Sequence, residues 1–269
     1  MSRIETAAGG APALVEQRGH TLLVTLNRPG VMNAVNGELS SAVGAALEEA
    51  DRDPEVRAVV LTGAGGRAFC AGADLKALAR GESIAAPGHE EWGFLGYVRH
   101  AISKPTIAAV NGFALGGGTE LVLASDLAVA ADTAVFGLPE VSRGIFAAAG
   151  GVFRLPEQLP RKIAMEMVLT GEPIDADRAL QLGLVNRVVP AADVLDAALA
   201  LAERIAVNAP LAIQASKRVA LGFREGRVPG EAARWEHNDQ EIRDLLATDD
   251  AKEGTRAFAE KRRPQWQAR

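Results

Sequence analysis

The chain has 269 residues, of which 48% are hydrophobic and 23% charged, as in an ordinary soluble globular protein with a sizeable core. A formal net charge of −5 argues against a nucleic-acid partner. The first residues contain no apolar signal core, and the longest uncharged stretch, 105–119, is too short and too glycine-rich to span a bilayer. With one cysteine, Cys70, no intramolecular disulfide can form, and we expect a cytoplasmic protein that does not engage a membrane.

The first two-thirds of the chain alternate strand and helix signals. Residues 1–12 predict a frayed tail, and apolar runs at 13–17 and 21–26 predict a hairpin. Asn36 can cap a helix that runs to about Asp51. Further elements follow in order, namely strands at 56–62, 106–110 and 127–130, a short helix opened by Asp74 and a buried helix over 117–124. This alternation predicts an α/β core.

The last third changes character. After a strand at 185–189 the pattern is almost wholly helical, with helices predicted at 191–207, 210–223, 230–246 and 249–261. We therefore place a domain boundary near residue 205, between a core that carries the candidate site (1–205) and a C-terminal helical region (206–269). Residues 77–100 are the most irregular stretch of the chain and contain Trp92, Phe94 and Tyr97.

Two segments of small residues precede helix starts. They are Gly116–Gly118 and Ala71–Ala73, the latter followed by Asp74. A helix start offers free N–H groups and a partial positive charge, and glycine lets a substrate carbonyl approach the backbone. Tight strand-to-helix packing explains the glycines of the first segment equally well when that segment is taken alone. If two N–H groups converge on one oxygen, they stabilise an enolate by about 3–4 kcal/mol each.

Two glutamates accompany these segments. Glu120 lies in an otherwise apolar helix, where desolvation raises the pKa of a carboxyl toward that of a useful general acid. Glu140 follows Pro139 and, taken alone, is better explained as an acid in a first helical turn. Two carboxylates can share one water. Beside a backbone oxyanion hole they would add water across an activated double bond, or remove it.

Other chemistry is weakly signalled. The glycines of Gly63–Gly66 lack the spacing of a dinucleotide loop, and the four histidines show no metal spacing. Cys70 has no histidine close to it in the sequence and is better explained as a small buried apolar residue than as a nucleophile.

In combination, the segments resemble the enoyl-CoA hydratase/isomerase (crotonase) family over nearly the whole chain. The resemblance is carried by six motifs in order, namely Leu26–Pro29 with Asn33–Ala34, Ala68–Leu75, Pro105–Gly112, Gly116–Glu120, Phe136–Glu140 and Ala257–Lys261. It implies a spiral of ββα turns with a C-terminal helical region that builds a homotrimer or a hexamer, a dimer of trimers. No metal or redox cofactor is implied, and coenzyme A is part of the substrate.

The resemblance also assigns residues. The oxyanion hole corresponds to the N–H groups of Ala73 and Gly117, and the acid–base pair to Glu120 and Glu140, with Glu120 preferred as the activator of water and Glu140 as the proton donor. The coenzyme A portion should follow Val31, Met32, Ala71, Asp74, Leu75 and Lys76, and its adenine end should meet Phe258 and Lys261 of a neighbouring subunit. An acyl pocket lined by Trp92, Phe94 and Tyr97 is as well explained by loop packing.

The presence of both glutamates favours a hydratase that acts on a 2-enoyl-CoA thioester. One departure is that Ala147–Ala149 stand where many hydratases have a Pro-Gly or Pro-Asp pair. The Gly150–Gly151 turn and the ending Ala257–Trp266 resemble carnitinyl-CoA dehydratases, which are the alternative, together with Δ3-Δ2 isomerases. A non-catalytic acyl-CoA binder is disfavoured because it would not need both carboxylates. Acyl chain length and pathway stay open.

Overall fold

The computed structural model describes residues 10–224 and 226–269. Most of the predicted N-terminal tail, residues 1–9, lies outside them. The predicted hairpin is confirmed, since β1 (Ala13–Arg18) pairs antiparallel with β2 (Thr21–Leu26). Helix α1 (Gly37–Arg52) begins where predicted, because the Asn36 side chain accepts a hydrogen bond from the Leu39 amide.

The chain then repeats one unit, in which a strand of a large sheet is followed by a strand of a small sheet and by a helix. The repeats are β3 (Ala58–Gly63), β4 (Ala68–Cys70) and α2 (Leu75–Ala79), then β5 (Thr106–Val110), β6 (Phe113–Leu115) and α3 (Gly117–Ala124), then β7 (Leu127–Ala131), β8 (Val135–Gly137) and the 3-10 helix η4 (Pro139–Arg143). These are the ββα turns that the resemblance implied.

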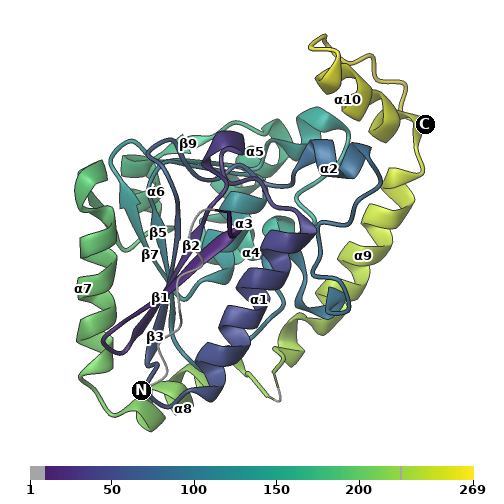
Figure 1. Ribbon diagram of the computed structural model, residues 1–269. Coiled ribbons are helices and arrows are strands. Elements are labelled where there is room, and N and C mark those ends of the chain that lie inside the picture. Colours follow the sequence, from purple (N-terminus) through teal and green to yellow (C-terminus); the bar gives the residue numbers. More distant parts are fainter. Residues whose placement is uncertain (1–9, 225) are drawn as a thin grey trace.

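Equivalent strands stack in register into two sheets. The large sheet has the order β1-β2-β3-β5-β7-β10, where β10 is Arg187–Val189, and is parallel from β2 onward. The small sheet has the order β4-β6-β8-β9, where β9 is Ile174–Asp175. Strands β3 and β5 are fully buried, because helix α7 (Val194–Ala206) covers one face of the large sheet while α1 lies on the opposite side (Figure 1).

Three short helices between β8 and β10 were not predicted. They are α4 (Gly151–Gln158), α5 (Arg161–Thr170) and α6 (Ala176–Leu182). Pro156 lies inside α4 and Pro160 precedes α5, so no apolar period continues long enough to stand out in the sequence. Further 3-10 turns are η1 (Pro29–Val31), η2 (Glu90–Trp92), η3 (Phe94–Gly96), η5 (Ala191–Asp193) and η6 (Pro229–Glu231).

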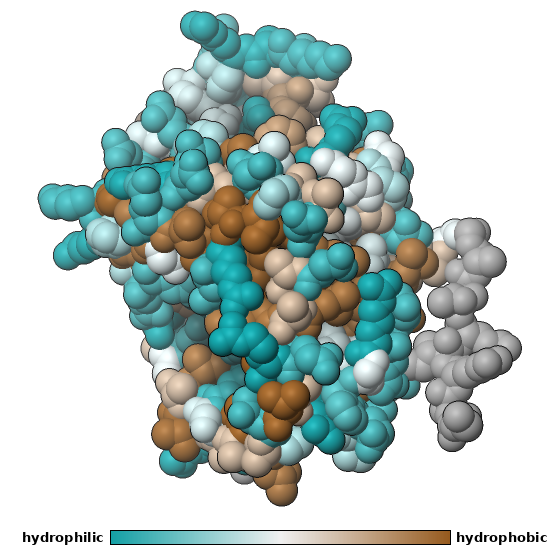
Figure 2. Space-filling model, turned by 90° about the vertical axis from the view of Figure 1, so that its left-hand side faces the viewer, coloured by the Kyte–Doolittle hydropathy of each residue, from teal (hydrophilic) through white to brown (hydrophobic). Residues whose placement is uncertain are grey.

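The C-terminal part is helical, as predicted, with narrower bounds. Helix α8 is Pro210–Leu221, α9 is Ala232–Leu246 and α10 is Asp249–Ala259. Helix α9 runs along the side of the molecule away from α7, and α10 lies at its far end (Figure 1). The face that carries α7, at the left of Figure 1, mixes apolar and polar side chains (Figure 2). In the described ranges, no helix has the length and apolar character needed to cross a membrane.

Candidate active site

The first predicted oxyanion donor, Ala73, lies between β4 and α2. Its segment is held by backbone hydrogen bonds to Val35, which donates to Gly72 O at 2.9 Å and accepts from the Asp74 amide at 2.9 Å. Both bonds are made by residues next to Ala73, through the Gly72 carbonyl and the Asp74 amide. The Ala73 amide itself donates no hydrogen bond within residues 10–224 and 226–269, and so stays available to a ligand.

The second predicted donor, Gly117, is the first residue of α3. It follows Gly116, whose φ of 56° is a left-handed conformation that favours glycine. The Gly117 amide also has no acceptor in the described part of the chain. A β-carbon on Gly72 would lie 3.4 Å from Gly117 N, so the segments that carry the two free amides are in contact. This is the arrangement that can polarise one carbonyl oxygen.

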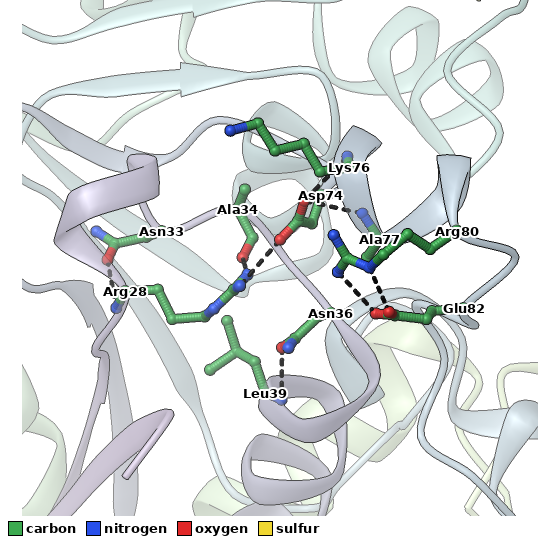
Figure 3. A network of polar contacts seen from close by, with 10 residues as sticks. All are labelled: Arg28, Asn33, Ala34, Asn36, Leu39, Asp74, Lys76, Ala77, Arg80 and Glu82. Carbon is green, nitrogen blue, oxygen red and sulfur yellow. Dashed lines mark hydrogen bonds and ion pairs between the residues drawn. The ribbon is translucent and has the colours of Figure 1, made fainter. Parts of the chain in front are cut away.

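A polar network fixes the segment that carries Ala73 (Figure 3). Arg28 donates to Asp74 Oδ2 at 2.9 Å and to the Ala34 carbonyl, and Asp74 Oδ1 accepts from the amides of Lys76 and Ala77 at the start of α2. Burial acts to raise the pKa of Asp74, but the hydrogen bonds from Arg28 and from α2 lower it, and the lowering prevails. Asp74 is therefore a charged anchor of this turn.

We expect Arg28→Met to lower the free energy of unfolding by about 2 kcal/mol, because it leaves the buried Asp74 carboxylate without its cation. Urea unfolding at pH 7 measures the change. The matched control is Arg80→Met, which breaks the exposed Arg80–Glu82 pair in the same network and should cause no measurable change. Equal stability of the Arg28→Met variant and the wild type would contradict this role.

The first carboxylate, Glu120, is buried in α3 with 3% of its surface exposed. Its Oε1 accepts a hydrogen bond of 2.8 Å from the Gly151 amide at the start of α4. Burial, and then the nearby charge of Glu140, raise the pKa of Glu120 to about 8, against the lowering effect of the Gly151 bond.

The second carboxylate, Glu140, lies in the first turn of η4. A β-carbon on Gly116 would come within 2.7 Å of Glu140 Oε1, so the carboxylate lies against the turn that precedes Gly117. Glu140 Oε2 is buried and has no hydrogen-bond partner within the described residues. Burial raises the pKa of Glu140 to about 7. A buried acceptor without a partner is costly, and a water or a substrate proton would satisfy it.

The two glutamates titrate as one pair. Each raised pKa lies near neutrality, and the charge of one carboxylate disfavours ionisation of the other, so near neutral pH one of the two tends to stay protonated. One carboxylate can then accept a proton while the other donates one. The Ala73 and Gly117 amides, which have no acceptor within the described residues, lie on two adjoining segments, so the site can stabilise an oxyanion and move protons in the same step.

The raised pKa values predict a pH-dependent stability. A carboxyl with a folded-state pKa above its unfolded value stabilises the fold fully below about pH 4.5, and this contribution is lost as the pH rises through about 8. Between pH 5.5 and 8.5 the wild type should lose roughly 2 kcal/mol or more relative to Glu120→Gln in urea unfolding. The exposed Glu172→Gln control should keep the wild-type slope. Parallel curves for all three proteins would contradict the burial of this charge.

Comparison with known proteins identifies the family. The family model for enoyl-CoA hydratase/isomerase matches residues 16–269. The chain belongs to the enoyl-CoA hydratase/isomerase family. The curated relatives include enoyl-CoA hydratase EchA19 of Mycobacterium tuberculosis, 41% identical over 98% of this chain and 99% of that protein, and a carnitinyl-CoA dehydratase of Proteus mirabilis, 42% identical over 94% and 97%.

Solved structures confirm the predicted crotonase fold. The crystal structure of a carnitinyl-CoA hydratase from Mycobacterium avium is 62% identical, covers 97% of this chain with all of its own, and superposes with a TM-score of 0.96. The crystal structure of an enoyl-CoA hydratase from Mycobacterium tuberculosis H37Rv is 45% identical, with a TM-score of 0.75. Relatives with both kinds of name therefore share this fold.

The residues that the family resemblance assigns to coenzyme A lie mostly on the rim of the site. Val31 and Leu75 are each 40% exposed, Lys76 is exposed, and Met32 and Ala71 are joined by a 3.1 Å backbone bond. Asp74, in contrast, is buried and engaged by Arg28. Val31, Leu75 and Lys76 are thus exposed in the segments that flank Ala73, and the role of all six residues in binding coenzyme A stays a prediction.

Phe258 and Lys261 lie on and just after α10. The Phe258 ring is 42% exposed and carries the Arg143 guanidinium 4.0 Å from its centroid. Arg143 ends η4, the element that holds Glu140, so α10 packs against the segment of its own chain that carries this predicted site residue. Whether a neighbouring subunit's nucleotide reaches Phe258 stays a prediction.

The three aromatics of the irregular segment lie in different places. Phe94 lies directly against Gly117, where its ring would collide with any β-carbon. Trp92 stacks between His89 and His100, with centroids 3.9 Å and 4.6 Å away, and packs on Gly44 of α1. The Tyr97 hydroxyl bonds to Ser125 Oγ at 2.8 Å, beyond the C-terminal end of α3. Of the three, Phe94 is the one that lies beside a predicted oxyanion donor, Gly117.

Sequence reasoning missed several supporting groups. The Gly151 amide holds Glu120, Arg28 holds Asp74, and Arg154 lies close enough to Glu120 to lower its pKa. The Gly150–Gly151 pair before a helix was a usable signal, because it repeats the glycine-then-helix pattern of Gly116–Gly118. Nothing local to Arg28 or Arg154 indicates their distant partners.

Proposed function

We propose that the protein catalyses the reversible addition of water to the C2–C3 double bond of a 2-enoyl-CoA thioester, giving a 3-hydroxyacyl-CoA. The observation that carries this proposal is the pairing of two carboxylates, the buried Glu120 and Glu140 with its buried Oε2, with the amides of Ala73 and Gly117, which donate no hydrogen bond within the described residues. An isomerase needs only one acid–base group, and a binder needs neither.

In the proposed mechanism the thioester oxygen accepts hydrogen bonds from Ala73 and Gly117, and the developing enolate charge is stabilised there. A water bound between the carboxylates attacks C3 and gives up one proton to Glu120. Glu140 delivers a proton to C2. The reacting form of the pair therefore carries its proton on Glu140, and the proton taken up by Glu120 returns to Glu140 before the next turnover. Elimination runs through the same steps in reverse, with the two carboxylates exchanging the roles of acid and base.

The second candidate is a carnitinyl-CoA dehydratase, which performs the same elimination on an acyl chain that carries a trimethylammonium group. The observation that favours it is the 62% identity to a Mycobacterium avium protein described as a carnitinyl-CoA hydratase. The carboxylate pair would lie near such a cation. The two candidates share the mechanism and differ only in the acyl group.

A substrate comparison separates them. We would measure kcat/KM for crotonyl-CoA and for crotonobetainyl-CoA with the same enzyme, using Glu120→Gln as the blank. A preference of 100-fold or more for crotonyl-CoA, equivalent to about 3 kcal/mol of transition-state discrimination, supports the simple hydratase. The opposite preference supports the dehydratase. Absence of turnover with both substrates would contradict the proposed chemistry.

We also propose a trimer or a dimer of trimers, with the acyl-CoA as the only ligand required. Three large apolar side chains on and before α8 are exposed, namely Val207 at 74%, Leu211 at 77% and Val219 at 83%. Burial of these side chains against a second subunit would remove apolar surface from water. Sedimentation velocity of the wild type tests the oligomeric state, and a monomer would contradict it.

The part of the chain that the structure describes has no cluster of three metal-ligating side chains.

A further inference from the structure

The carboxylate of Glu120 depends on a turn that a C-terminal helix covers from outside. Its Oε1 is held by the Gly151 amide, and that amide is the end of the turn formed by Ala147–Gly151. Asn238 of α9 is 5% exposed and donates from Nδ2 to the Ala148 carbonyl at 2.9 Å. The turn is therefore bonded to the catalytic carboxylate on one side and to α9 on the other.

A second residue of α9 fits the same turn by shape. Gly150 has a φ of 102°, and a β-carbon there would approach Trp235 Cη2 to 3.0 Å. The indole is itself fixed, because the Arg99 guanidinium lies 3.9 Å from its centroid and Phe153 meets it edge-on at 4.8 Å. The fixed Trp235 ring thus limits the space into which Gly150 can move.

Three ionisable groups face Glu120 from the elements around it, namely Glu140 from η4, Arg154 from α4 and Cys70 from β4. Arg154 is bonded to Glu231, immediately before α9, at 2.7 and 2.9 Å. The Asn238 bond to the Ala148 carbonyl involves none of these charges. The Trp235 ring does contact them, because the Arg154 guanidinium lies 5.2 Å from its centroid and its Nε1–H donates to Glu231 Oε2 at 3.1 Å. Loss of the Asn238 contact alone therefore changes the geometry of the Gly151 amide while leaving the charges around Glu120 in place.

We infer that Asn238 and Trp235 are positioning residues for Glu120, and that α9 acts by clamping the turn that carries the Gly151 amide. The C-terminal helical region then serves the active site of its own chain. The inference rests on the proposed function where it concerns rate. Its effect on the Glu120 carboxyl is independent of any substrate.

The test is a ¹³C NMR titration of the full-length protein labelled in its glutamate carboxyls, with the Glu120 signal identified by its loss in Glu120→Gln. In Asn238→Ala we expect the midpoint for Glu120 to rise by roughly half a pH unit, because a weakened amide bond no longer favours the ionised form. His237→Ala is the matched control, since the His237 side chain is 77% exposed on the same helix. In this variant the Glu120 midpoint should not move.

Kinetics supply the second readout. With the substrate that the wild type turns over, we expect kcat of Asn238→Ala and Trp235→Ala to fall about 10-fold, with KM within about twofold, because the water-activating group is misplaced while thioester binding is intact. Trp235→Phe, which keeps an aromatic ring against Gly150, should retain most of the activity. Asn238→Ser, which keeps a donor, replaces Asn238→Ala if that variant does not fold.

An unchanged Glu120 midpoint together with wild-type kcat in the folded Asn238 variant would overturn the inference. If the wild type turns over neither thioester but the midpoint still rises in Asn238→Ala, the proposed function fails and the positioning role stands. The two failures are therefore distinguishable.

Discussion

Replacing Glu120 or Glu140 by glutamine should lower kcat for the preferred 2-enoyl-CoA by about 10³-fold, within the range expected for loss of a positioned acid–base group. Glutamine is close in size to glutamate and keeps hydrogen-bonding atoms, but it cannot accept or deliver a proton at neutral pH. Because the proposed contacts of the thioester oxygen are to backbone amides that neither substitution removes, we expect KM to change by less than about threefold.

The measurement follows the loss of conjugated-thioester absorbance when the enzyme is mixed with substrate. Glu157→Gln is the control, because Glu157 is an exposed carboxylate, 53% accessible, that pairs with Arg234 on the surface. It should retain wild-type kcat. Turnover that survives either Glu120→Gln or Glu140→Gln would contradict a mechanism in which both carboxylates act.

Removing the Gly117 amide should cost about 10²–10³-fold in kcat, the usual cost of one oxyanion donor. Proline removes this donor, and it is tolerated in the first turn of a helix, where Gly117 lies. Since the ring of Phe94 would collide with any side chain at this position, the substitution should be made in a Phe94→Ala protein. The double variant Phe94→Ala/Gly117→Pro then lacks the N–H with the collision relieved.

The matched control for this prediction is Phe94→Ala/Gly117→Ala, which adds a β-carbon but keeps the N–H. It should lie within about 10-fold of Phe94→Ala alone, whereas the proline variant falls well below it. Circular dichroism and urea unfolding verify that both variants are folded. Similar kcat values for the alanine and proline variants would mean that Gly117 N–H is not an oxyanion donor.

The sequence predicted the parts of the fold whose signals are local. The helix Gly117–Ala124 has the predicted bounds, because a glycine run is followed at once by a continuous apolar segment. The predicted helix cap at Asn36 and the predicted burial of Cys70 are also confirmed, because each depends only on neighbouring residues in the sequence. Helices α4 to α6 were missed because each is short, α4 contains Pro156, α5 and α6 are bounded by Pro160, Gly171 and Gly183, and their amphipathic faces depend on tertiary partners.

The residues of the candidate site likewise fall into those with a local sequence signal and those without one. Glu120 and the glycines before it stand out because a carboxylate in an apolar helix violates the local pattern. The groups that tune the site lie far away in the chain. Arg28 reaches Asp74 across 46 positions and Asn238 reaches Ala148 across 90, and no spacing rule connects residues so distant. Such contacts become visible only when the packing of α2 and α9 is known.

The most direct test of the account follows solvent atoms into the product. The wild type would be incubated with its preferred 2-enoyl-CoA in D₂O enriched in H₂¹⁸O, and the product analysed by mass spectrometry and proton NMR. We expect one solvent oxygen at C3 and one deuterium at C2 of the 3-hydroxyacyl-CoA, and neither label in the Glu120→Gln protein. Deuterium incorporation or double-bond migration without ¹⁸O would contradict hydration by the glutamate pair and indicate an isomerase.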